Sequence, residues 1–138
     1  MSKKVFLGGT ANHSQWRETL KPMLTIDFFD PVVPVWNEEA RIREIQERET
    51  CDYCLYVITP KMTGFYAVAE VVDDSNKRPD KTVYCVLSTD DDKEFEPHQI
   101  KSLLAVGKLV KRNGGHWLQN LNEVAEFLNT GIEPKVDS

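Results

Sequence analysis

Acidic side chains and glycines stand at several points where one regular element of the chain gives way to the next. Glu70 lies in the opening turns of a predicted helix that follows the apolar run 51–60, and Asp30 closes a shorter apolar run. Gly8, Gly9 and Thr10 follow the first apolar run of the chain. Carboxylates in pairs can attack the anomeric carbon of a sugar and move protons around it, through an oxocarbenium-like transition state. These residues can therefore perform carboxylate chemistry on a glycoside, and the alternative for a single helix glutamate is a solvated surface residue.

The run 51–60 precedes the helix that carries Glu70 and is expected to position it. It is apolar, β-branched or aromatic at nearly every position and is stopped by Pro60, so it predicts a strand buried on both faces at the centre of a sheet. After a short turn, apolar residues recur at helical spacing, namely at Phe65, Val68, Ala69 and Val72. Open α/β sheets bind their ligands beyond the carboxyl ends of their strands, and Glu70 is expected there.

Strands and helices are predicted to alternate along the whole chain. Strands are expected at 4–10, 26–34, 51–60, 82–87 and 116–118, and helices at 14–24, 38–51, 65–72, 97–112 and 120–128. The stretch 73–80 is interpreted as a polar stop, and 88–96 as an acidic loop. This alternation predicts one α/β domain over residues 1–138, with a parallel sheet of four or five strands covered by helices on both faces.

The composition is that of an ordinary globular protein of 138 residues, with 28% charged and 41% hydrophobic residues. The net charge of -5 argues against nucleic acid as a partner, because phosphate binding needs clustered lysine and arginine. No apolar run approaches the ~20 residues that cross a bilayer, and no signal peptide is recognised. We therefore expect no membrane association and a cytoplasmic setting.

The cysteine spacing and the lack of the usual catalytic motifs exclude several other kinds of site. Cys51 and Cys54 have the spacing of a redox or zinc pair, but they straddle the start of an apolar strand and no second pair exists, so core packing is favoured for both. No nucleophile elbow, P-loop lysine, Gly-x-Gly-x-x-Gly or histidine-rich metal spacing is present. The adjacent acids at 90–92 lack the spacing and the glycine of a calcium loop. No metal and no cofactor is expected.

Two features have two interpretations each. The glycine pair Gly8 and Gly9 either lets the backbone approach a ligand closely or forms a plain tight turn. Trp36 lies in a loop of Pro, Val and Asn after the predicted strand 26–34, where it either covers the edge of the core or lines a ligand pocket.

Several short motifs, taken together, form a pattern. They are Val5-Phe6-Leu7-Gly8-Gly9-Thr10, Trp16-Arg17, Phe29-Asp30-Pro31, Asp52 with its apolar strand, and Gly64-Phe65-Tyr66-Ala67-Val68-Ala69-Glu70. This pattern resembles the nucleoside 2-deoxyribosyltransferase family, and within it a small, poorly characterised deoxyribosyltransferase-like branch. The similarity extends over about residues 4–87.

The resemblance implies a flavodoxin-like or Rossmann-like three-layer α/β/α fold and cleavage of an N-glycosidic bond. In that family a glutamate holds the deoxyribosyl group and passes it to another base or to water. Glu70 matches this nucleophile, and Glu44 falls near the acidic residue that transfers a proton to the base. Gly9 and Thr10 match the loop that lies against the substrate, and Tyr66 matches a position just before the nucleophile.

The expected ligand is a small nucleoside or nucleotide. Its binding residues are expected to be Gly8, Gly9, Thr10, Asp30, Trp36, Met62 and Tyr66. The resemblance also implies that the chain can form a homo-oligomer, because many transferases of the family share sites between subunits.

Two positions depart from the family pattern. Gly64 stands where the transferases commonly carry an aspartate, about six residues before the nucleophile, and Val72 replaces a usual glycine. These changes affect sugar recognition and keep three hypotheses open. The chain cleaves or transfers the glycosyl group of a (deoxy)nucleoside or nucleotide, hydrolyses a related glycoside such as NAD, or binds nucleotides as a non-catalytic sensing module.

Overall fold

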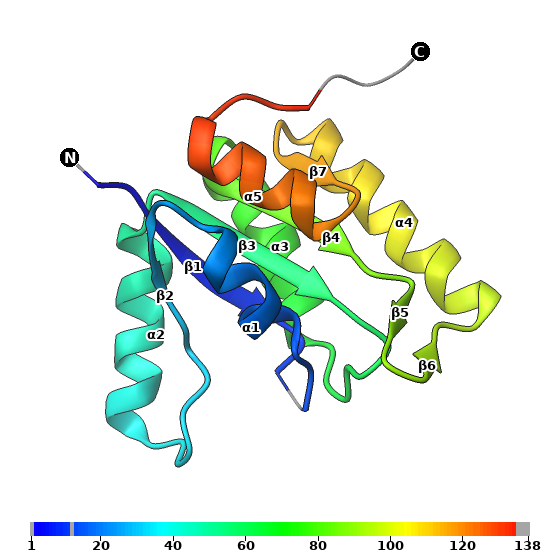
Figure 1. The fold of residues 1–138 in the computed structure, drawn as a ribbon, viewed down its shortest axis with the longest axis horizontal. Helices are drawn as coiled ribbons and strands as arrows, with labels where there is room; N and C mark the ends of the chain where they lie inside the picture. Colours follow the sequence, from blue (N-terminus) through cyan, green and yellow to red (C-terminus); the bar gives the residue numbers. More distant parts are fainter. Residues whose placement is uncertain (1, 12, 135–138) are drawn as a thin grey trace.

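A computed structural model describes residues 2–11 and 13–134, and within them one all-parallel sheet lies between two layers of helices (Figure 1). The strands are β1 (Lys4–Gly9), β2 (Asp27–Phe29), β3 (Tyr53–Ile58), β4 (Thr82–Val86) and β7 (His116–Leu118). The main helices are α1 (Trp16–Leu20), α2 (Glu38–Thr50), α3 (Tyr66–Lys77), α4 (Pro97–Arg112) and α5 (Leu121–Thr130). The predicted three-layer α/β/α architecture of flavodoxin-like or Rossmann-like type is confirmed.

The five strands lie in the order β2-β1-β3-β4-β7. The chain therefore runs outward from β1 to β2 and then crosses back through α2 to β3, on the other side of β1. This is the strand order of the flavodoxin-like doubly wound sheet, in which the crevice between the carboxyl ends of the first and third strands is the usual place for a ligand.

Strand β3 is the centre of the sheet, as its sequence predicts. It pairs with β1 through Leu7 and Leu55, and with β4 through Leu55 and Val83. All six of its residues are buried. Alternate residues of the strand face opposite layers.

Two hydrophobic cores lie on the two faces of the sheet. On one face Leu55 packs with Trp16 and Leu20 of α1 and with Phe127 of α5. On the other face, Tyr56 belongs to a second core with buried residues of α3 and α4. Cys51 and Cys54 belong to the second core and Cys85 to the first; all three are buried and unpaired, and burial raises the pKa of each thiol to about 12.

The largest departure from the prediction is the length of α3, which continues to Lys77 instead of stopping near residue 72. The stretch 73–80 is polar, but Asp74 and Ser75 are fully buried within it. Their polar groups are satisfied, because Asp74 accepts hydrogen bonds from Arg48 and Arg78, and Ser75 donates one to the Val72 carbonyl. Burial of paired polar residues thus extends the helix.

Smaller departures occur elsewhere. The second strand is only three residues long, Asp27–Phe29, and the expected acidic loop contains a short hairpin of β5 (Thr89–Asp90) and β6 (Lys93–Glu94). Helix α1 begins at Trp16 instead of at residue 14, and its expected distortion at Pro22 is a 3-10 turn, Lys21–Met23. Within the described ranges, none of the helices has both the length and the apolar character that crossing a bilayer requires.

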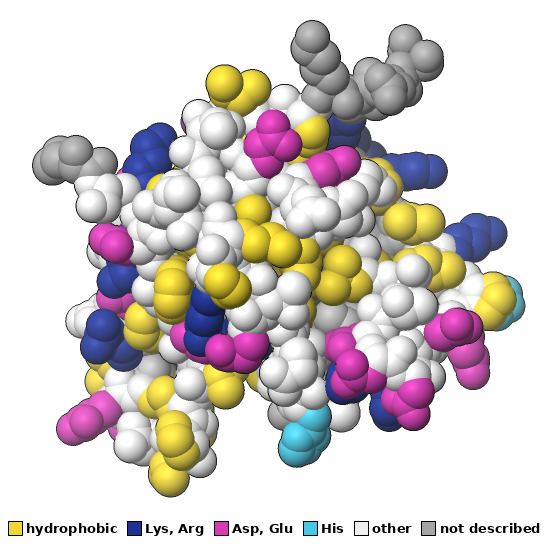
Figure 2. All heavy atoms as spheres, in the orientation of Figure 1, with side chains coloured by type: hydrophobic (Ala, Val, Ile, Leu, Met, Phe, Trp, Pro, Cys, Tyr) yellow, Lys and Arg dark blue, Asp and Glu magenta, His cyan; other side chains and the backbone are white. Residues whose placement is uncertain are grey.

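The segment 30–37, which joins β2 to α2, is unusual in exposing apolar side chains. Its exposed members are Val32, Val33, Val35 and Trp36. A group of hydrophobic side chains is visible at the lower left of Figure 2, where Figure 1 places this segment. The segment lies beside the carboxyl end of the sheet and forms part of the site described next.

Candidate active site

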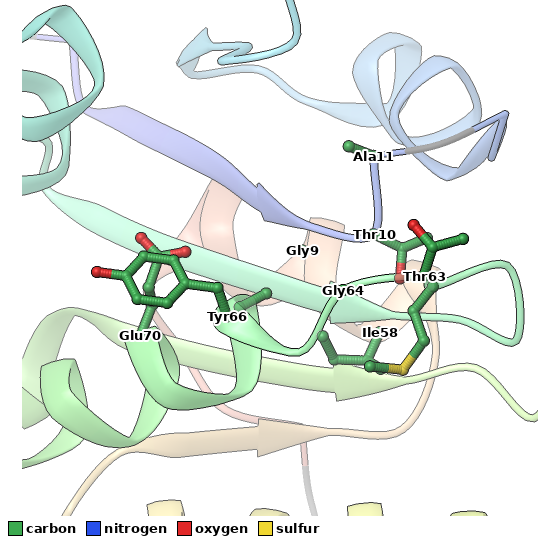
Figure 3. Close-up of a pocket in the computed structure, with 10 residues that line it drawn as sticks. Gly9, Thr10, Ala11, Ile58, Thr63, Gly64, Tyr66 and Glu70 are labelled. Atoms are coloured by element: carbon green, nitrogen blue, oxygen red, sulfur yellow. The ribbon is translucent and has the colours of Figure 1, made fainter. Parts of the chain in front are cut away.

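Two adjoining cavities lie at the carboxyl ends of β1 and β3, and Gly9, Ala11 and Glu70 line both of them. We call them the loop cavity, of about 300 Å³, and the tryptophan cavity, of about 270 Å³. The loop cavity is also lined by Thr10, Ile58, Met62, Thr63, Gly64, Tyr66 and Ala67 (Figure 3). The tryptophan cavity is also lined by Phe6, Gly8, Arg17, Pro31, Val32, Val33, Trp36 and Glu44. Glu70 is therefore the acidic group common to the two spaces.

The loop after β1 is held against β3 by backbone geometry. Gly9 has a φ of +111°, and a Cβ atom there would lie 2.1 Å from the carbonyl oxygen of Val57. The Thr10 amide donates to that same oxygen, and the Thr10 hydroxyl accepts a hydrogen bond from the Thr59 amide. Gly9 is therefore required by the close approach of β1 to β3, and the Thr10 hydroxyl fixes the loop that lines the cavity.

Glu70 projects from the second turn of α3 on the same side as Tyr66, because residues four apart share a helix face (Figure 3). Only 12% of its side chain is exposed, and its Oε2 lies 3.5 Å from Nη1 of Arg48. Burial raises the pKa of Glu70 to about 7; Arg48 opposes the rise, and the charges of Glu44 and Asp74 add to it. Near neutral pH this carboxyl group exchanges readily between its two charge states.

Glu44 reaches the tryptophan cavity from α2, a different element from the one that carries Glu70. Helix α2 begins after Asn37, whose side chain accepts a hydrogen bond from the Ala40 amide, so the helix start is fixed by an N-cap. Burial raises the pKa of Glu44, while Arg48 and Arg17 lower it. Two acids with raised pKa values thus line one cavity, as is common where protons are transferred.

Arg17 also lines the tryptophan cavity, although the sequence placed it only in the motif pattern and gave it no role in the site. It is only 4% exposed, donates from Nε to the Leu7 carbonyl at 3.0 Å and from Nη1 to the Thr10 carbonyl at 2.6 Å, and lies over the Trp16 ring. Burial lowers its pKa to about 10, against the charge of Asp30, so it stays protonated at neutral pH. Arg17 therefore brings a fixed positive charge to the tryptophan cavity and ties down the loop after β1.

Asp30 does not line either cavity within the described structure, although it was expected to bind substrate. It accepts a hydrogen bond from Lys21 at 2.8 Å and forms an ion pair with Arg17 at 3.6 Å. It also accepts a hydrogen bond from the Val32 amide. The residue supports Arg17 and the start of the segment 30–37, and the hollow that it lines shares Pro31 and Val33 with the tryptophan cavity.

The remaining expected binding residues do line the cavities. Gly8 and Trp36 line the tryptophan cavity, and Met62 and Tyr66 line the loop cavity. Trp36 is 55% exposed and Tyr66 is 74% exposed, so both rings present apolar surface at the open side of the site. The pocket-lining interpretation of Trp36 fits this placement better than a role in the core.

Comparison of the chain with models of protein families, with curated proteins and with solved structures finds no match. Among the described residues, no group of three or more His, Cys, Asp or Glu side chains is arranged to hold a metal ion. The function is therefore inferred from the fold and from the two acids, Glu44 and Glu70, with their arginine neighbours.

Proposed function

We propose that the chain cleaves the N-glycosidic bond of a (deoxy)nucleoside or nucleotide, with Glu70 as the nucleophile and Glu44 as the second acid. The observation that carries this proposal is that the two carboxyl groups come from different helices and line the same cavity, at the switch point of a doubly wound sheet. The sequence resemblance to nucleoside 2-deoxyribosyltransferases supports the same roles.

The two acids divide the reaction into two balanced steps. In the first, a carboxylate oxygen of Glu70 attacks C1′ of the sugar, the C1′–N bond breaks, and its electron pair goes to the base, which takes a proton from Glu44. In the second, a water molecule or another base attacks C1′ of the glycosyl ester, Glu44 removes a proton from the attacker, and Glu70 is released. Glu44 alternates between acid and base in this scheme.

The two cavities suit the two halves of such a substrate. Apolar and aromatic side chains line the tryptophan cavity, including Phe6, Val32 and Trp36, and a flat base can pack against them. The loop cavity combines the backbone at Gly9 and Gly64 and the Thr10 side chain with apolar residues such as Ile58 and Met62, and its polar groups can contact a sugar. Glu70 would then lie between base and sugar, where the bond is broken.

Release of the base from a defined set of substrates tests the proposal. The protein is incubated with deoxynucleosides, their 5′-monophosphates and NAD, each with and without a free acceptor base, and products are separated by chromatography. We expect release of base, and exchange into the acceptor if the reaction is a transfer. Glu70→Gln should abolish release, whereas Glu126→Gln, an exposed acid on α5 remote from both cavities, should leave it unchanged.

The alternative, a non-catalytic nucleotide-sensing module, is favoured by Gly64. No atom lies within 4 Å of a Cβ added at this position, so a side chain there would have open space. No other group therefore takes the place of the aspartate that the transferases commonly carry there. Nucleotides that raise the melting temperature without any release of base would support this alternative. Full activity in the Glu70→Gln variant would contradict the enzymatic proposal.

A further inference from the structure

Helices α2 and α3 are joined by a cluster of charged side chains directly behind Glu70. Nε and Nη2 of Arg48 donate to the two carboxylate oxygens of Asp74, at 3.1 and 2.9 Å. Asp74 is fully buried, and it also accepts hydrogen bonds from the Tyr56 hydroxyl at 2.5 Å and from Nε of Arg78 at 3.0 Å. With donors on both oxygens, Asp74 is held in one orientation and anchors the guanidinium of Arg48 through a two-pronged contact.

This anchoring determines where the rest of the Arg48 guanidinium points. Its Nη1 lies 3.5 Å from Oε2 of Glu70, and its Nη2 also approaches the Glu70 carbonyl at 3.4 Å. Because Arg48 follows Glu44 by four residues on α2, the two side chains share a face of that helix. One positive charge therefore stands beside both acids of the candidate active site.

We propose that Arg48, anchored by Asp74, is a positioning residue that orients the Glu70 carboxylate and keeps it ionised for attack. The inference rests on the proposed role of Glu70, but its first readout needs no substrate. Arg48 does not line either cavity, so it acts through Glu70 and not by contact with the reacting atoms.

The charged groups that face Glu70 act in opposite directions. Glu44 from α2 and Asp74 from α3 favour its protonated form, as does burial, while Arg48 favours the ionised form. Arg17 reaches the same cavity from α1. Tyr56 of β3 stays neutral, because burial and the charge of Asp74 raise its pKa.

The charge of Arg48 does not vary with pH in the working range. Burial lowers its pKa, but the hydrogen bonds with Asp74 and the negative charges around it raise that pKa above its ordinary value. Without Arg48, Glu70 would still be buried and would keep two negatively charged neighbours, Glu44 and Asp74. An opposite charge within about 4–6 Å shifts a carboxyl pKa by about 1–3 units, so its loss should raise the Glu70 pKa by at least about one unit, a tenfold change in ionisation constant.

The test is a titration of the Glu70 carboxyl carbon by NMR in protein labelled at glutamate, with the signal assigned by its absence in Glu70→Gln. Arg48→Gln should raise the Glu70 pKa by about one unit or more. Arg48→Lys keeps the charge, but a single amine cannot bond both oxygens of Asp74 and also face Glu70. The Glu70 pKa should therefore rise in this variant too, but by less. Arg41→Gln, an exposed arginine of α2 paired with Glu38, is the matched control and should cause no shift.

The same variants are then assayed for turnover over a range of pH. We expect the acidic limb of kcat/KM to move with the NMR titration in each Arg48 variant. An unchanged Glu70 titration in Arg48→Gln, or in Arg48→Lys if the glutamine variant does not fold, overturns the inference even where base is still released. A shifted titration in a protein that releases no base supports the inference on ionisation and contradicts the proposed function.

Discussion

Replacement of Glu70 by glutamine should make the protein more stable above neutral pH while removing its proposed activity. The glutamine keeps the size and the hydrogen-bonding capacity of the side chain but removes the ionisable group. Burial raises the pKa of Glu70 from 4.5 to about 7. In the unfolded chain Glu70 ionises at the lower pKa. At any pH above 4.5 the folded protein must therefore either keep Glu70 protonated or bury its negative charge, and both cost stability.

The sign and the size of the effect follow from this shift. The stability associated with the raised pKa is fully present below about pH 4.5 and is lost as the pH rises to about 7. Each unit corresponds to about 1.4 kcal/mol, which gives an upper limit of about 3 kcal/mol. Since the cavities are open to water, which screens the charge, we expect a gain of about 1–3 kcal/mol for Glu70→Gln at pH 8 relative to pH 4.

Urea unfolding followed by tryptophan fluorescence, at steps from pH 4 to pH 8, measures this difference. Subtracting the wild-type unfolding free energy at each pH removes the contributions of all other groups. Glu126→Gln, an exposed replacement on α5, serves as the control. If the Glu70→Gln difference does not vary with pH, the carboxyl group is not desolvated and the cavity wall around it is not formed as described.

Further predictions concern the remaining parts of the site. If Glu70 is the nucleophile, kcat/KM should rise with pH through about 7 as it ionises, and a rate that falls through this range would assign it the role of the acid. Trp36→Ala should raise KM for nucleosides several-fold with little change in the melting temperature, because the ring is 55% exposed. Gly9→Ala should cost about 1–3 kcal/mol in urea unfolding, since its Cβ would meet the Val57 carbonyl at φ +111°. Gly64→Asp should leave stability unchanged, and increased turnover of deoxynucleosides would support a sugar-binding role for that position.

The sequence predicts the middle of the sheet well because β1, β3 and β4 are buried along most of their length and are therefore mostly apolar. Strand β3 shows this most clearly, since all six of its residues are buried. The parallel topology then brings Gly9 and Glu70 to one edge, although they are far apart in the chain. The meeting of Glu44 with Glu70 in one cavity follows from the crossover of α2 next to α3, and the sequence indicated it only through the family resemblance.

The role of Arg48 could not be predicted because its partners, Glu70 and Asp74, belong to another helix. Arg48 belongs to a helix with no buried residue, and Asp74 to a polar stretch, so each resembles a solvated residue until the two helices are packed together. Asp30 was expected to bind substrate because it is a carboxylate at a strand end, and the structure pairs it with Lys21 and Arg17 next to the two cavities.

The charged cluster and the proposed nucleophile should respond to mutation with opposite signs, and this contrast separates their roles. Glu70→Gln removes a poorly solvated acid and should stabilise the fold at high pH. Arg48→Gln removes one partner of the fully buried Asp74, and breaking such a pair commonly costs about 3–5 kcal/mol. Because Arg78 and Tyr56 still contact Asp74 in that variant, the loss should fall at or below the lower end of that range. If replacement of Arg48 lowers both the stability of the fold and the ionisation of Glu70, this one side chain links the packing of α2 on α3 to the chemistry of the cavity.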